Sequence, residues 1–293
     1  MNLKKILTNK NIALILGNGI NRYNSVATNN SWDSMLLKLW EENVNSKTLK
    51  IPKGISLTEF YDALDLNIRS SSTDLQKEFC DLMEDWKPGN HHRTIVDWAS
   101  KNKTPILTTN FENTLSETKS LSLKHTETPK FTYYYPWGSH YAESKVSNPS
   151  SQFAIWHING MQKYKRSIRL GLSHYMGSVQ RARAMFHRGK EDRLFSGKNK
   201  DRWRGHQTWL HVIFNNDLMF IGLGLDTTEV FLRWLLIERA KYFRAFPKRK
   251  KKGYFVFSGD GVSQGQRLFL ESVGLELINV PTYKDIYEKP WKS

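Results

Sequence analysis

Three short segments place polar or glycine residues directly after apolar runs that are typical of buried strands. They are LGNGIN over residues 16–21, TTNFE over residues 108–112 and IWHING over residues 155–160. In open α/β sheets, ligands bind in the crevice at the carboxyl ends of the strands. A glycine-rich turn, an asparagine and a histidine that meet there predict a nucleotide pocket equipped for catalysis.

The turn after the first run is the candidate phosphate-binding element, with Gly17, Asn18, Gly19, Ile20 and Asn21 as its residues. Glycine lets the backbone approach a pyrophosphate, whose oxygens accept hydrogen bonds from free N–H groups. A Gly-x-Gly pair also occurs in ordinary turns. The dehydrogenase fingerprint has a third glycine at the position that Arg22 occupies here. The acidic residue that this fingerprint places after the second strand is also missing. A nicotinamide dehydrogenase is therefore disfavoured.

The second segment offers Thr109 and Asn110. A carboxamide both donates and accepts hydrogen bonds, so Asn110 at a strand end can orient a ribose hydroxyl and a water molecule. The alternative is that Asn110 only caps the helix that follows, a position that asparagine favours.

The third segment ends its strand in His157, and Asn159 follows two residues later. The side chain of histidine titrates near pH ~6.5, so His157 can accept a proton from a ribose hydroxyl or water at neutral pH. A hydrogen-bonded structural histidine is the alternative. His174 is a second candidate for the base.

A later segment, GLGLDTT over residues 222–228, is another strand-to-helix turn. Gly222, Gly224 and Leu225 can line the adenosine side of a dinucleotide. Thr227 and Thr228 serve equally well as helix caps.

The elements that must position these residues alternate between strands and helices. We expect strands over 11–16, 105–108, 153–157, 218–223, 254–257 and 275–280, and helices over 32–44, 57–68, 73–85, 91–100, from 227 or 228 to 243, and 264–273. Such alternation predicts an α/β fold, a Rossmann-like three-layer sandwich with a mainly parallel sheet. We expect one domain over 1–293 with a helical insertion at about 45–100. Residues 116–152, including Tyr133 to Gly138, are expected to form a loop over the pocket.

Composition narrows the classes further. The formal charge of +16 is concentrated at about 160–205 and in Lys248 to Lys252, which are either solvated loops or a docking surface for a polyanion or an acidic protein. The single cysteine, Cys80, excludes a disulfide within the chain and a zinc site of several thiolates. No apolar stretch approaches the ~18 residues of a membrane span, and no signal peptide is evident, so we expect a cytoplasmic protein without membrane contact.

In this order the segments resemble the sirtuin-like family, specifically the zinc-free branch known as NAD hydrolases in bacterial antiphage defence. The family's glycine-rich first turn matches residues 17–20, and its Thr-Asn-aromatic-acid segment matches 109–112. Its strand ending in a histidine–glycine element matches 156–160, and its late glycine-rich strand end matches 221–225. The likeness extends from about residue 11 to residue 280.

One departure from the family pattern matters. In most relatives the catalytic histidine directly precedes the glycine, often as His-x-His-Gly, whereas here Asn159 precedes Gly160. Either His157 has taken the role of base, or His174 has, or the protein is impaired as an enzyme. Residues 157 and 159 face the same side of a regular strand, which keeps the first option geometrically feasible.

The resemblance implies NAD⁺ as substrate, no metal, and cleavage of the nicotinamide–ribose bond to nicotinamide and ADP-ribose, with a cyclic product as an alternative. It implies catalytic roles for Asn110 and His157. Gating is implied too, by an activating partner from the same defence operon (a helicase-like ATPase, an Argonaute-like protein or a nucleotide-sensing enzyme) or by homo-oligomerisation. A protein deacylase is disfavoured because that branch holds zinc with four cysteines. The alternative is a weakly catalytic or non-catalytic nucleotide-sensing module that binds a partner or nucleic acid through its basic face.

Overall fold

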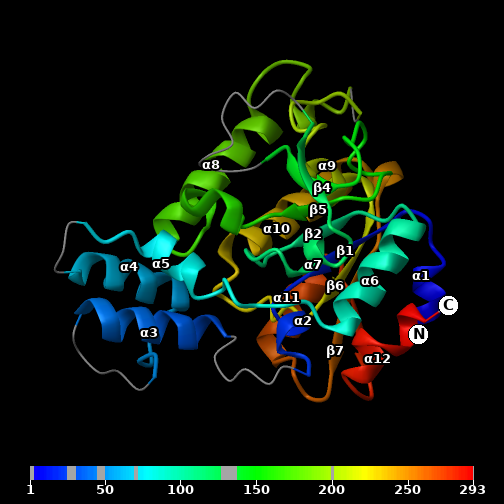
Figure 1. Cartoon of the computed structure of the whole chain (residues 1–293). Coiled ribbons are helices and arrows are strands. Elements are labelled where there is room, and N and C mark those ends of the chain that lie inside the picture. The colour runs from blue at the N-terminus through cyan, green and yellow to red at the C-terminus, as the bar shows by residue number, and fades with distance from the viewer. Residues whose placement is uncertain are drawn as a thin grey trace.

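The computed structural model describes residues 3–24, 31–44, 50–68, 72–126, 137–198 and 201–292. A sheet with strand order β3-β4-β5-β2-β1-β6-β7-β8 forms the centre of this part of the chain (Figure 1). Its strands are β1 (Ile12–Leu16), β2 (Ile106–Thr108), β3 (Ser122–His125), β4 (Ser139–Ala142), β5 (Ile155–His157), β6 (Asp217–Ile221), β7 (Gly253–Ser258) and β8 (Glu276–Val280). Six neighbouring strands are parallel, in the spatial order β5, β2, β1, β6, β7 and β8. The strand β4 pairs antiparallel with both β3 and β5.

The strand β1 shows why these residues form a central strand. Ala13 and Ile15 point into one hydrophobic core, and Ile12, Leu14 and Leu16 point into the other. Both faces are buried, so the strand is a continuous apolar run rather than an alternating one.

Helices cover both faces of the sheet and complete a Rossmann-like three-layer α/β sandwich, which confirms the expected fold class. One face packs against α8 (Leu172–His187), α9 (Trp209–Asn215), α10 (Val230–Ala245) and α11 (Gln264–Ser272). The other packs against α1 (Leu3–Leu7), α6 (Asn90–Lys101), α7 (Thr114–Glu117) and α12 (Lys284–Tyr287). Among the described residues, no helix is both long and apolar enough to cross a membrane.

Three helices gather to one side of this sandwich: α3 (Trp32–Val44), α4 (Leu57–Asn67) and α5 (Leu75–Asp81) (Figure 1). They have a core of their own, which includes Leu36, Leu64 and Phe79. Of the helices within or next to the expected insertion at about 45–100, α4 and α5 share this core with α3, which precedes residue 45. The helix α6 instead packs on the sheet through Ile95 and Val96.

The remaining elements are short: α2 (Gly19–Arg22) and the 3₁₀ helices Gln162–Ser167, Leu194–Ser196, Pro247–Arg249 and Lys289–Trp291. The expectation of a loop over 116–152 was wrong, because β3 and β4 pair there and extend the edge of the sheet beyond β5. Each strand has only four residues, too few for a periodic pattern to identify. The aromatic run at 133–136 lies outside the described residues.

Candidate active site

A cavity of about 740 Å³ opens at the carboxyl ends of the central strands. The strand β1 lies between β2, which follows it in the chain, and β6, which is reached much later. The order of the strands thus reverses at β1. Such a reversal is the topological switch point where open α/β sheets bind ligands. The volume lies within the range of about 300–1,000 Å³ typical of cofactor and small-molecule pockets.

The first glycine turn contributes Asn18 and Gly19 to the cavity wall, whereas Gly17 and Ile20 do not line it. The Gly17 N–H donates to the Ile221 carbonyl at 2.9 Å, and the Gly19 N–H donates to the Gly222 carbonyl at 2.9 Å. A Cβ on Gly19 would lie 2.6 Å from the Cα of Gly222. These glycines let two turns pack together. Their N–H groups were expected to bind a pyrophosphate, but both already donate to backbone carbonyls.

The turn after β6 has the donors that the first turn lacks. Gly222 and Gly224 line the cavity, whereas Leu225, which was expected to line it, is buried and does not. Gly222 and Leu225 adopt positive φ angles of 69° and 47°. The backbone N–H groups of residues 223–226 donate to no acceptor within the described residues. Successive free N–H groups beside a left-handed residue are suited to binding an anion.

Asn110 and Asn159 both line the cavity, although each side chain is nearly buried. The Asn110 Nδ2 and the Asn159 Oδ1 have no hydrogen-bond partner in the described part of the chain. Buried amides left without a partner are uncommon, and a polar ligand would satisfy them. Asn110 is not a helix cap, because α7 begins at Thr114 and Asn113 holds the cap position. Thr109 lines the same wall.

His157 does not line this cavity. Its side chain is buried, its Nδ1 donates to the Asn110 backbone carbonyl at 2.7 Å, and Tyr141 packs edge-on against the ring. Burial lowers the pKa of His157 to about 4, although the bond to Asn110 opposes this shift. The imidazole thus supports the Asn110 backbone from behind. The expected shared orientation of residues 157 and 159 was wrong, because β5 ends at His157 and only Asn159 reaches the cavity.

His174 does not line the cavity either. It lies in the first turn of α8, where its Nδ1 accepts long hydrogen bonds of 3.4 Å from the backbone N–H groups of Leu170 and Gly171. Its ring packs against Tyr61 of α4. His174 therefore joins α8 to the helical insertion, and the described cavity wall contains no imidazole.

A buried polar network stands behind the first turn and explains Asn21. Its Nδ2 donates to the Glu112 Oε1 at 2.9 Å, and its Oδ1 accepts from the His92 Nε2 at 3.0 Å. The Thr114 hydroxyl also donates to Glu112. Burial raises the pKa of Glu112, and the bond from Asn21 opposes this shift. Asn21 does not line the cavity; it holds the turn after β1 to the segment after β2.

The sequence analysis missed Glu229, which lines the cavity directly before α10. Burial and the nearby Asp226 raise its pKa from 4.5 to about 7, and the facing Asn159 amide opposes the shift. A carboxyl that titrates near neutrality in a cavity is a candidate acid or base. The available signal was an acid three residues after Asp226 at a helix start. The sequence pattern of that turn predicted the adenosine side of a dinucleotide or helix caps, whereas in the structure the Thr228 N–H donates to the Asp226 Oδ1 at 2.8 Å.

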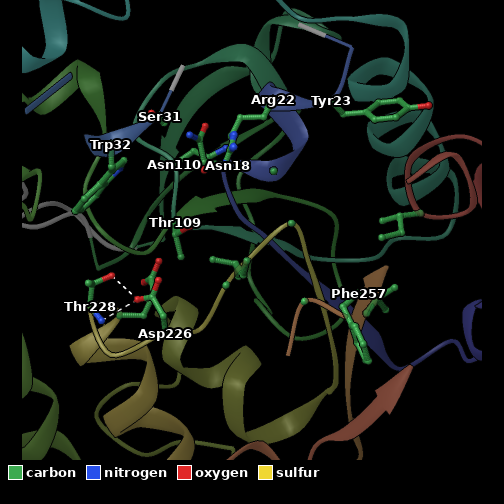
Figure 2. A pocket seen from close by; sticks show the side chains of 18 of the residues that line it. Asn18, Arg22, Tyr23, Ser31, Trp32, Thr109, Asn110, Asp226, Thr228 and Phe257 are labelled. Carbon is green, nitrogen blue, oxygen red and sulfur yellow. Dashed lines mark hydrogen bonds between the residues drawn. The ribbon is translucent and has the colours of Figure 1, made fainter. Parts of the chain in front are cut away.

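The rest of the wall offers one cation and several aromatic rings. Figure 2 shows Asn18, Arg22 and Asn110 on one side of the cavity, with Asp226 and Thr228 across from them. Arg22 is exposed and forms no ion pair with a described carboxylate. Aromatic side chains provide surfaces on which a base can stack; they are Tyr23, Trp32, Tyr175, Phe255, Phe257, Tyr283 and Tyr287.

Within the described residues, no group of three or more histidine, cysteine, aspartate or glutamate side chains is arranged to hold a metal ion. A comparison of the chain with protein-family models and with curated protein sequences gives no match.

Proposed function

We propose that the chain cleaves the nicotinamide–ribose bond of NAD⁺ to give nicotinamide and ADP-ribose. The observation that carries this proposal is the buried Asn110 Nδ2, which has no hydrogen-bond partner among the described residues, in a cavity of about 740 Å³ at the switch point of the sheet. The order of the motifs, which resembles the zinc-free sirtuin-like hydrolases, supports the same chemistry.

The walls of the cavity suit the parts of this substrate. The free N–H groups after β6 and the Arg22 guanidinium would bind the pyrophosphate. The Asn110 amide would hold the ribose and the attacking water. Neutral nicotinamide departs and leaves an oxocarbenium-like ribose, so the reaction depends on positioning and charge stabilisation more than on a strong nucleophile.

The test is NAD⁺ turnover by the purified chain, alone and with the proteins encoded beside it, with nicotinamide and ADP-ribose separated by chromatography. We expect Asn110→Ala to lose at least about 100-fold in rate, as for loss of a positioned group in other active sites. Asn102→Ala, the same change at the exposed end of α6, is the matched control. Intact NAD⁺ in every mixture, or full activity of Asn110→Ala, would refute the proposal.

The absence of an imidazole from the described cavity wall favours a second candidate, a non-catalytic module that senses ADP-ribose or a related nucleotide. Such a module would bind ADP-ribose with measurable heat and leave NAD⁺ intact. If its basic face also binds nucleic acid, that affinity would fall steeply as salt increases.

Uncontrolled hydrolysis of NAD⁺ would harm the host cell, so we also propose that a partner protein gates it through the basic run Lys248 to Lys252. This run precedes β7, so it lies at the amino ends of the strands, opposite the cavity. Within it, Arg249 is engaged with the Gly197 carbonyl, whereas Lys250 is exposed. Charge reversal at Lys250 should weaken association with an acidic partner on a sizing column, and unchanged association would exclude this surface.

A further inference from the structure

We infer that Glu229 is the base of this cavity and accepts the proton of the attacking water. This inference rests on the proposed function. In the step, the water oxygen bonds to the ribose C1′, and the C1′–N bond breaks with its electron pair going to the nicotinamide nitrogen. The water proton moves to the Glu229 carboxylate, from which it later returns to solvent.

The position of Glu229 comes from the fold. It directly precedes α10, and its carbonyl accepts a hydrogen bond from the Arg233 N–H at 2.9 Å, which fixes its backbone to the first turn of that helix. Its side chain faces Asn159, which arrives from the end of β5 on the other side of β1. Two segments far apart in the sequence thus bring a carboxyl and an unsatisfied amide oxygen to one cavity.

The surroundings of Glu229 suit proton transfer at neutral pH. Asp226 is the charged neighbour that acts on it, and Asp226 itself is held by the N–H and hydroxyl of Thr228 at 2.8 and 2.5 Å. The other charged or titratable side chains that line the cavity are Arg22 on α2, Tyr23, Asp33 on α3, Tyr175 on α8, and Tyr283 and Tyr287 at the carboxyl end of the chain. With a pKa of about 7, the Glu229 carboxyl is ionised in part of the molecules and protonated in the rest at neutral pH. A general base needs to change between these two forms.

The two histidines suggested by the sequence compete poorly for this role. The His157 imidazole is buried behind Asn110, and His174 is committed to the backbone at the start of α8. Neither lines the cavity, whereas Glu229 does.

The experiment measures NAD⁺ cleavage between pH 5.5 and 9 for the wild-type chain, Glu229→Gln, Glu229→Asp and His157→Gln, with the activating partner present if one is needed. We expect wild-type kcat to rise with pH and level off above pH ~7, because the base must be ionised. Glu229→Gln should lose about 100-fold or more, the usual effect of removing a general base. Glu229→Asp should recover part of the rate, and His157→Gln should keep the wild-type pH profile.

ADP-ribose binding, measured by titration calorimetry, separates lost chemistry from lost folding. Glu229→Gln should bind ADP-ribose within threefold, an order-of-magnitude criterion, because the carboxylate is not needed to hold the pyrophosphate. Two results would overturn the role of Glu229 without affecting the proposed function. In the first, the wild type is active and Glu229→Gln has a rate within fivefold of it. In the second, both Glu229 variants lose ADP-ribose binding together with the rate. Absence of turnover by wild type under every condition overturns the proposed function and this inference together.

Discussion

The environment of Glu229 predicts a stability effect that requires no substrate. The carboxyl lies in the cavity wall, and burial and Asp226 raise its pKa from 4.5 to about 7. The folded protein therefore favours the protonated form, and ionising this group costs stability as the pH rises from about 4.5 to about 7. Glutamine has the shape of the protonated side chain and cannot ionise. Glu229→Gln should thus stabilise the protein at high pH.

The size of the effect follows from linkage. One pKa unit is worth about 1.4 kcal/mol, so a rise from 4.5 to about 7 corresponds to about 3 kcal/mol at pH 8. At pH 5 the unfolded chain is already partly ionised, and the same linkage gives about 1 kcal/mol. The difference between pH 5 and pH 8 is about 2.5 kcal/mol. Because Glu229 is only half-buried, solvent screening reduces this value, and we expect a gain of about 1 to 2.5 kcal/mol.

The assay is urea denaturation of wild type and Glu229→Gln at pH 5 and pH 8 in one buffer system, followed by tryptophan fluorescence. Other titrating groups cancel in the difference between the two proteins. Glu276→Gln, a change to an exposed carboxylate on β8, is the control and should track the wild type. If the difference between Glu229→Gln and wild type is the same at both pH values, the carboxyl is not desolvated and the reasoning fails.

Two further predictions concern packing and acid stability. Gly19→Ala should destabilise the fold by about 1–3 kcal/mol in chemical denaturation, because its methyl group would collide with backbone atoms of the turn after β6. Gly177→Ala, which meets nothing within 4 Å in the middle of α8, should instead stabilise it by about 1 kcal/mol; equal effects would contradict the packing role of Gly19. His157 has a pKa lowered to about 4 from 6.5, so the unfolded state takes up its proton first and stability falls with pH below 6.5. His157→Gln should remove about 2 kcal/mol of the loss between pH 7 and pH 5, and an unchanged loss would show that the ring is not buried.

Local pattern was sufficient for the elements that carry strong periodicity or capping signals. The helix over 32–44 was expected with the bounds that α3 has, and the first strand was expected to end at Leu16, where β1 ends. These features depend on nearest neighbours along the chain. The pair β3 and β4 was missed because each strand gains its stability from its partner rather than from its own four residues.

A parallel α/β sheet and the edge at which polar residues collect could be predicted from the amino-acid sequence, since both follow from apolar runs and the residues that end them. Which of those residues face the cavity depends on how distant segments pack against one another. His157 and Asn159 are two positions apart, yet one supports Asn110 from behind and the other faces Glu229. Beyond the end of a strand, side chains no longer alternate strictly between the two faces of the sheet. Their orientation there depends on packing against distant segments, which no local sequence pattern encodes.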